Sequence, residues 1–216
     1  MIKILLLLLS LNIYAIDLVH PKLYFNIGYP YVSLQSNTAQ YDNDYLGLSI
    51  GAVMEYQLDE FSSLDLSINA SYFPERESLT IAPNNNVVTG KGSLLTSFYA
   101  LSYSRIISTY KSDSIIFSIG PSIGVHTINY DKFVVNNTSI SAKNRVRIRN
   151  HGARTSLKVR TKDLNKYFEI VYYYMLQDKY TVIDDATLDA QSVREDRAVA
   201  NDSSWSVIFN LGFRIF

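Results

Sequence analysis

The side chains that could catalyse a reaction are few in this sequence, which has three histidines and no cysteine. A serine nucleophile needs a histidine within hydrogen-bond reach and an acid that orients this histidine. Ser122 and His126 share one face of a segment that alternates like a strand, but about two pleats separate them, too far for direct contact. His20 precedes the first such segment, and His151 lies at a break in another. We therefore predict that the protein is not an enzyme and that His126 is a hydrogen-bonded interior residue.

The composition narrows the class of protein further. Without cysteine there are no disulfides and no cysteine zinc site, and we expect no cofactor and no metal. The chain has 20 Lys+Arg and 20 Asp+Glu, so it lacks the basic excess of a nucleic-acid binder. A hydrophobic content of 47% excludes a disordered chain. The length of 216 residues suits one domain or two small ones.

Residues 1–15 have the pattern of a secretory signal peptide. Lys3 supplies the positive start, residues 4–11 are apolar, and Ala15 is a suitable cleavage residue. The alternative is an N-terminal membrane anchor, but about 12 apolar residues are short for a membrane span. We expect residues 16–216 to form the mature domain, and export of a chain without cysteine suits a bacterial envelope protein.

Apolar and polar residues alternate with a period of two in eight segments, and no part of the chain after residue 15 shows a convincing helical period of 3.6. The clearest segment sets Leu48, Ile50 and Ala52 against Ser49 and Gly51. This pattern predicts an all-β protein. The eight segments are 22–34, 45–56, 62–73, 94–106, 115–128, 145–160, 167–177 and 205–216.

Two segments are irregular. In 145–160 the apolar phase changes near Gly152, which predicts a β-bulge at this glycine. Pro121 lies inside 115–128, where it removes a hydrogen-bond donor, so we expect an irregular ladder at that point.

The connections between the segments alternate in length. The links 57–61, 107–114 and 161–166 are short, whereas 37–44, 74–92, 129–144 and 178–202 are longer and polar. Short turns at one end and long loops at the other are typical of a transmembrane β-barrel with periplasmic turns and extracellular loops. We predict a single antiparallel up-and-down barrel of eight strands, or of ten if a long loop hides a pair, with both chain ends on the periplasmic side.

The residue types on the two faces predict which face meets lipid. One face carries bulky apolar residues without a charge over about ten residues per strand, which matches a tilted transmembrane strand. The other face is mostly Gly, Ser and Asn, which fits a narrow lumen. A soluble lipocalin-like barrel, with the apolar face inside, is the alternative. Aromatic belts are expected from Tyr29, Tyr31, Tyr72, Tyr130 and Trp205 near the loops and from Tyr56, Tyr103, Phe117, Phe168 and Phe213 near the turns.

The last strand resembles the C-terminal sorting signal of bacterial outer-membrane barrel proteins, with Phe213, Ile215 and the terminal aromatic Phe216. Phe216 departs from that pattern because it is out of phase with the other two. The whole arrangement resembles the eight-stranded outer-membrane protein A and X families. The resemblance implies a location in the bacterial outer membrane, contact with outer-membrane lipid, and delivery by the barrel assembly machinery through the C-terminal strand.

The predicted lumen face carries both acids and bases, most of them near the periplasmic end. Charges kept away from water need partners. Segments two and three lie across an eight-stranded barrel from segments six and seven, so we expect a cross-lumen ion-pair cluster that plugs the barrel. Its members are Glu55, Asp65, Arg154, Lys158, Arg160, Glu169 and Arg214.

The loops are the expected interaction surface, because exposed loops on a rigid scaffold commonly carry binding. The longest loop, 178–202, contains the candidate interaction residues Asp184, Asp185, Asp189, Arg194, Glu195, Asp196 and Arg197. Segments 128–135 and 139–148 are expected to form a protruding hairpin whose edge could pair with a partner strand. We predict a structural or surface-interaction protein. The alternatives are a narrow pore and, less favoured, a lipid-modifying enzyme.

Overall fold

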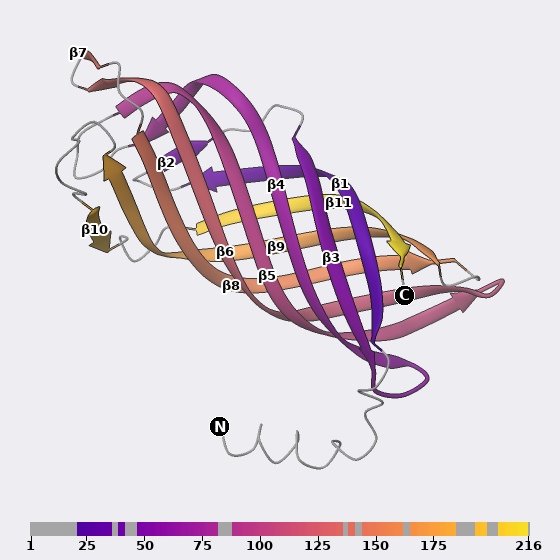
Figure 1. The fold of residues 1–216 in the computed structure, drawn as a ribbon. Coiled ribbons are helices and arrows are strands. Elements are labelled where there is room, and N and C mark those ends of the chain that lie inside the picture. Colours follow the sequence, from indigo (N-terminus) through magenta and orange to yellow (C-terminus); the bar gives the residue numbers. More distant parts are fainter. Residues whose placement is uncertain are drawn as a thin grey trace, which may run out of the picture.

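Eight long antiparallel strands form a closed barrel, which confirms the predicted fold class (Figure 1). The computed structural model describes residues 21–35, 39–41, 47–81, 88–135, 138–140, 144–161, 165–184, 193–197 and 203–215. The ring strands are β1 (Lys22–Gln35), β3 (Leu48–Gln57), β4 (Ser62–Ile81), β5 (Val88–Tyr110), β6 (Asp113–Val135), β8 (Asn144–Arg160), β9 (Lys166–Asp184) and β11 (Ser203–Arg214). The described residues contain no helix long and apolar enough to cross a bilayer.

The first and last strands close the ring. β1 pairs with β11 from Tyr24 opposite Arg214 to Gln35 opposite Ser203, and with β3 on its other side. We call the end of the barrel that carries residues 58–61, 111–112, 161 and 165 the turn end, and the opposite end the loop end. β1 begins and β11 ends at the turn end, as an even number of strands requires (Figure 1).

Parts of the segments predicted as long loops are strands. β4 continues to Ile81, β5 already begins at Val88, and β9 continues to Asp184. The prediction ended these strands too early because the apolar alternation stops at the edge of the membrane, whereas backbone groups still gain by pairing beyond it. Residues 82–87, 185–192 and 198–202 lie outside the described part of the chain.

Three further short strands lengthen the wall at the loop end without entering the ring. They are β2 (Ala39–Tyr41), which pairs with β1 and β4, β7 (Thr138–Ile140), which pairs with β6, and β10 (Val193–Arg197), which pairs with β9. The loops therefore do hold extra strands, but the transmembrane ring has eight strands and not ten.

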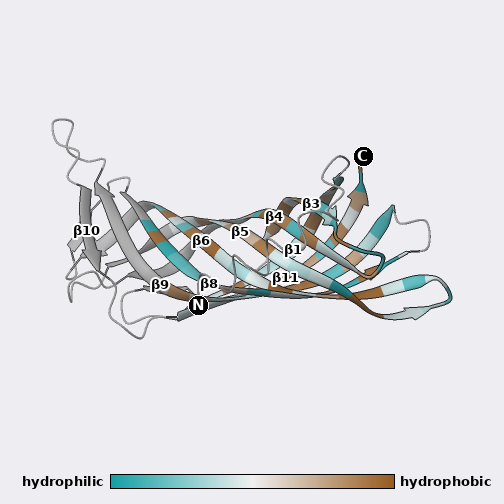
Figure 2. Cartoon of the chain, turned by 90° about the horizontal axis from the view of Figure 1, so that it is seen from below, coloured by the Kyte–Doolittle hydropathy of each residue, from teal (hydrophilic) through white to brown (hydrophobic). Residues whose placement is uncertain are grey.

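Side chains alternate between a buried lumen and an exposed outer surface in the predicted phase. Leu48 on β3, Ile68 on β4 and Leu211 on β11 are 62%, 43% and 52% exposed. Ser49 and Asn69, which directly follow Leu48 and Ile68 in the chain, are buried. Hydrophobic residues recur along the strands of the wall (Figure 2). An apolar surface of this extent is stable in lipid and not in water. The apolar face points outward, so the lipocalin-like alternative is wrong.

Two of the turns are stabilised by their backbone conformation and by side-chain hydrogen bonds. Lys111 and Ser112 have φ values of 48° and 77° and join β5 to β6 as a two-residue turn, tighter than the predicted link 107–114. In the turn between β3 and β4, the Ser62 hydroxyl and the Phe61 N–H donate to the Asp59 carboxylate at 2.6 and 2.8 Å. These hydrogen bonds hold the pKa of Asp59 below its usual range.

The predicted bulge at Gly152 is wrong. β8 pairs with β6 without a shift from Arg160 to Asn144, and Ile148 and Arg154 both point into the lumen. The irregularity lies on the partner strand, because Arg149 pairs with Lys179 while Asn150 pairs with Gln177. The apparent change of phase has another cause: the lumen is apolar near the loop end and charged near the turn end.

The irregularity expected at Pro121 affects one side of its strand only. The ladder between β5 and β6 is interrupted between Ala100 opposite Ser122 and Tyr103 opposite Ile119. On the other side, Pro121 pairs in register with Ala153 of β8.

Candidate functional site

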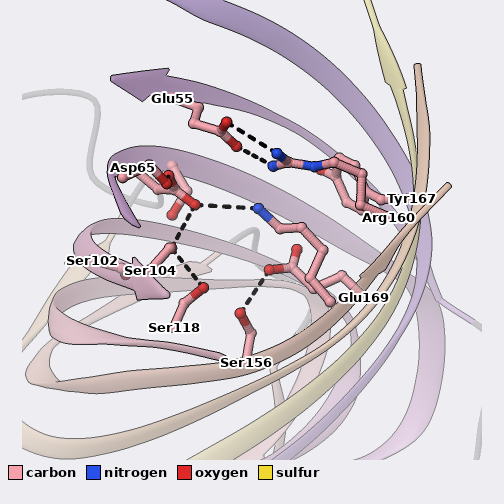
Figure 3. Close-up of polar contacts among 12 residues, drawn as sticks. Glu55, Asp65, Ser102, Ser104, Ser118, Ser156, Arg160, Tyr167 and Glu169 are labelled. Carbon is pink, nitrogen blue, oxygen red and sulfur yellow. Dashed lines mark hydrogen bonds and ion pairs between the residues drawn. The ribbon is translucent and has the colours of Figure 1, made fainter. Parts of the chain in front are cut away.

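Ion pairs cross the lumen near the turn end (Figure 3). Arg160 of β8 forms a bidentate contact with Glu55 of β3, and its Nη1 lies 3.1 Å from Glu55 Oε1. Lys158 of β8 donates from Nζ to Asp65 Oδ2 of β4 at 3.2 Å. These residues are 6% exposed or less, so the charges face each other away from bulk water.

Serine hydroxyls complete the coordination of Asp65. Ser63 donates to Asp65 Oδ1 at 2.8 Å, and Ser104 of β5 donates to Asp65 Oδ2 at 2.8 Å. The Ser104 hydroxyl also lies 2.7 Å from that of Ser118 on β6 (Figure 3). Hydrogen bonds from several strands therefore hold this carboxylate in one position, as a buried charge requires.

A third ion pair joins two neighbouring strands and not opposite walls. Arg154 of β8 donates from Nη2 to Glu169 Oε1 of β9 at 2.6 Å, and Ser156 donates to the same oxygen at 2.7 Å. Three buried acids thus face three buried bases, which we call the charge layer: Glu55, Asp65, Arg154, Lys158, Arg160 and Glu169.

The structure differs from the predicted cluster in two members. Arg214 lies at the exposed end of β11 and not among the buried charges. Lys22 was not expected, but its Nζ lies 3.5 Å from Glu55 Oε1 with its side chain 24% exposed. The sequence placed Lys22 at the start of a strand but gave no sign that its long side chain reaches the rim of the lumen.

Two tyrosine rings pack against the bases of the charge layer. Lys158 Nζ lies 5.0 Å from the ring centroid of Tyr167, and the Arg160 guanidinium lies 5.4 Å from that of Tyr24. The two rings meet edge to face, with centroids 5.4 Å apart. Cations over aromatic faces gain stabilisation that grows as water is excluded, so these rings help to fix the bases.

We expect Gly212→Ala to destabilise the barrel by about 1–3 kcal/mol, the usual cost of overpacking. The ring of Tyr167 lies directly over Gly212, where a Cβ would overlap with several ring atoms. Urea unfolding in lipid vesicles, followed by fluorescence of the single tryptophan, Trp205, measures the change. Gly124→Ala is the milder control, because its Cβ would lie 3.0 Å from the methyl group of Met175 and 3.2 Å from ring atoms of Phe98, without overlap. Equal stability of wild type and Gly212→Ala would contradict the packing argument.

A second layer of side chains fills the lumen between the charge layer and the loop end. The ring of Phe98 stacks on Tyr173 at 4.1 Å between centroids and meets His126 edge to face at 5.6 Å. We call the buried cluster around this stack the aromatic layer: Phe98, Ala100, Val171, Tyr173, Met175 and Ile208. Nearer the loop end, Leu94, Ile128 and Ile148 are also buried. Buried side chains of different chemistry thus lie at two levels of the described lumen.

Sequence reasoning missed the aromatic layer because it expected a lumen of small polar residues. The available signal was the unbroken apolar run 170–176. When both faces of a strand are apolar, the sequence does not alternate. The period-two pattern then cannot show that some of the apolar side chains point into the lumen.

Several strands of the barrel carry buried polar side-chain atoms that have no hydrogen-bond partner in the protein. Asn26 Oδ1 on β1, Ser49 Oγ on β3 and Asn69 Oδ1 on β4 belong to this set. Buried polar atoms of this kind are usually satisfied by internal water. Thr96 Oγ1 on β5 and Glu169 Oε2 on β9 belong to the same set, so positions suited to internal water are spread around the lumen.

The structure does not bring Ser122 and His126 into a nucleophile–base pair. The Ser122 hydroxyl contacts the sulfur of Met175 at 3.3 Å, and both ring nitrogens of His126 are buried without a hydrogen-bond partner. No described protein group is thus the hydrogen-bond partner expected for His126. His151 is exposed on the outer face, and His20 lies outside the described residues. The described part of the chain contains no group of three or more metal-ligating side chains.

The predicted interaction loop is described only in part. Asp184 ends β9, and Arg194, Glu195, Asp196 and Arg197 lie on β10, which pairs with residues 179–183 of β9. Asp185 and Asp189 lie outside the described residues, as does Phe216 of the sorting signal. Phe213 and Ile215 are 42% and 51% exposed on the outer surface.

Solved structures of similar fold are outer-membrane proteins. The chain resembles a major outer membrane protein from Thermus thermophilus, with a TM-score of 0.55, 8% identity, and coverage of 91% of this chain and 100% of that one. It also matches Ail, the attachment invasion locus protein of Yersinia pestis, with a TM-score of 0.47, 12% identity, and coverage of 91% and 99%. Ail in complex with the heparin analogue sucrose octasulfate matches with a TM-score of 0.46, 12% identity and the same coverage. No family model and no curated protein sequence matches the chain.

The fold and the surface give the location of the protein. A closed barrel with an apolar outer surface spans a membrane, since closure leaves no unpaired strand edge in lipid. Its fold is that of the Thermus outer-membrane barrel. The chain is therefore a β-barrel of the bacterial outer membrane.

Proposed function

We propose that this outer-membrane barrel is a plugged scaffold that presents its loop end to an extracellular partner and has no transport or catalytic role of its own. The observation that carries the proposal is the double filling of the lumen, by the charge layer and by the aromatic layer. An eight-stranded barrel is just wide enough for its side chains to fill it. Function is then carried by the rim and not by the interior.

The extended strands at the loop end support a binding role. β5 and β6 are both 23 residues long, about twice what a tilted transmembrane strand needs. Beyond the ring, β7 pairs with β6, and β10 pairs with β9. A strand paired on one side offers backbone N–H and C=O groups to a partner strand. The described parts of the predicted hairpin lie in this region, as do the candidate residues Asp184, Arg194, Glu195, Asp196 and Arg197.

Deletion of residues 134–141 tests the binding role. We expect the barrel to fold as before, because the deletion takes only the last two residues of the ring strand β6 and lies beyond the length that a tilted strand needs to cross the membrane. We expect bacteria that display it to lose adherence to cultured host cells. Migration of boiled and unboiled samples on a gel reports folding in the same preparation. Adherence that survives in a correctly folded deletion variant would remove this hairpin from the proposed surface.

Ser122 and His126 do not form a catalytic pair, which favours a function other than catalysis. Ser122 is engaged with Met175, and His126 contacts Phe98. Turnover of lipid A or phospholipid by the purified protein, abolished by His126→Ala, would overturn this part of the proposal.

A narrow path for water is the second candidate. Buried oxygens without a partner in the protein, such as those of Asn26, Ser49 and Asn69, favour it, because they would suit internal water. The stopped-flow shrinkage rate of vesicles that contain the barrel distinguishes the two candidates. A rate equal to that of empty vesicles supports the plug.

The last strand fits the proposed route of assembly. β11 pairs with both β9 and β1 and so closes the ring, and Phe213 faces outward. We propose that this strand is the part recognised by the barrel assembly machinery, as its resemblance to the sorting signal implies.

A further inference from the structure

The outer face of β8 changes from apolar to basic toward the loop end. Val159 and Leu157 are exposed to lipid near the turn end, at 39% and 44%. On the same face, His151 and Arg149 are exposed and Arg147 is partly exposed. Sequence analysis missed this basic column because it assumed a change of phase at Gly152, and β8 has none.

The basic column lies where the strand leaves the hydrocarbon core. A tilted strand crosses with about 9–11 residues. A span that starts at Val159 therefore ends between His151 and Arg149, which places Arg149 and Arg147 at the headgroup level of the leaflet at the loop end. The neighbouring positions on β6, Val125 opposite Arg149 and Thr127 opposite Arg147, are uncharged.

No described acid neutralises the guanidinium groups of Arg147 and Arg149. Among the described side chains, Arg147 and Arg149 have no ion-pair partner, and Arg147 Nε is buried without a hydrogen-bond partner. The acids that the structure places at turns, Asp59 and Glu60, are at the opposite end of the barrel. Two arginines spaced by two residues stand side by side on one face of a strand, a spacing that suits the oxygens of a phosphate monoester.

We infer that the outer face of β8 binds the phosphate groups of a phosphorylated glycolipid in the outer leaflet, with Arg147 and Arg149 as the phosphate ligands. The basic column meets the headgroup layer, and its charge is complementary to phosphate. Arg binds phosphate bidentately and is therefore better suited than a point charge to hold one lipid in place. This site lies on the outer wall and is independent of the lumen and of the loop hairpin.

Binding of diphosphoryl lipid A to the detergent-solubilised barrel, measured by native mass spectrometry, tests the assignment. Each basic residue near an anionic surface contributes a factor of about five, so Arg147→Gln with Arg149→Gln is expected to lower the affinity roughly tenfold to thirtyfold. Arg105→Gln is the matched control, since Arg105 is exposed on β5 at the turn end. We expect it to bind lipid A like the wild type.

Three results would overturn the inference. They are unchanged affinity in the double variant, an equal loss in Arg105→Gln, and equally tight, equally arginine-dependent binding of phosphatidylglycerol, which would mean that any anionic lipid suffices. Gel migration of boiled and unboiled protein verifies that each variant is folded. Weaker binding at high salt is expected in the wild type, because exposed charges are screened.

Discussion

Asp65→Asn is expected to lower the free energy of unfolding by about 3–5 kcal/mol, the usual cost of leaving a buried charge without its partner. Lys158 would keep its charge in a lumen where both residues are 1% exposed or less. The amide oxygen can still accept from one of the two serines, Ser63 or Ser104, but the NH2 group that replaces the other oxygen cannot, so the variant loses the ion pair and one hydrogen bond. Urea unfolding in lipid vesicles, followed by Trp205 fluorescence, measures it.

Two further variants separate the ion pair from other causes. Glu60→Gln removes an exposed carboxylate of a turn and is expected to change stability by less than about 0.5 kcal/mol. Adding Lys158→Met to Asp65→Asn removes the unpaired charge, so we expect the double variant to regain much of the lost stability. If Asp65→Asn unfolds at the same urea concentration as Glu60→Gln, the charge layer does not stabilise the barrel.

The ring and the cross-lumen pairs could be predicted because each depends on a simple geometric rule. Alternation of Leu and Ile with Ser and Gly gives the face of each residue, as on β3 and β4. Strands that are four apart in an eight-stranded ring face each other, which brings Arg160 of β8 to Glu55 of β3. Neither rule depends on the conformation of the loops.

The features that sequence analysis missed depend on information that alternation does not contain. Tyr173 and Met175 lie between lipid-facing apolar neighbours, so their inward position leaves no mark in the hydrophobic pattern. Whether Arg149 points outward or into the lumen depends on whether β8 contains a bulge. The extra residue lies on β9, so Arg149 points outward. The strands beyond the membrane, such as β7, have polar sequences in which pairing and not burial supplies the stabilisation.

The two layers of the lumen predict that removal of the two acids that form the cross-lumen ion pairs does not open a pore by itself. In Glu55→Ala with Asp65→Ala, the aromatic layer still closes the barrel, since Phe98 and Tyr173 stack at 4.1 Å across the lumen side of β5 and β9. We expect the current trace of this variant in a planar bilayer to match that of the wild type. Larger or more frequent openings would mean that the charge layer is the gate of a passage.

Removal of side chains from both the charge layer and the aromatic layer is expected to create a conducting path. Adding Phe98→Ala and Tyr173→Ala removes two large buried rings, and each large-to-small change leaves a cavity at a cost of about 3–5 kcal/mol, so the combined variant must first be shown to fold by its gel migration. Cavities lined by Asn69 and the remaining bases Lys158 and Arg160 are polar and would fill with water. Such a pore should prefer anions, because the bases lose their acidic partners. A folded combined variant that stays silent would show that the apolar side chains near the loop end, Leu94, Ile128 and Ile148, close the barrel by themselves.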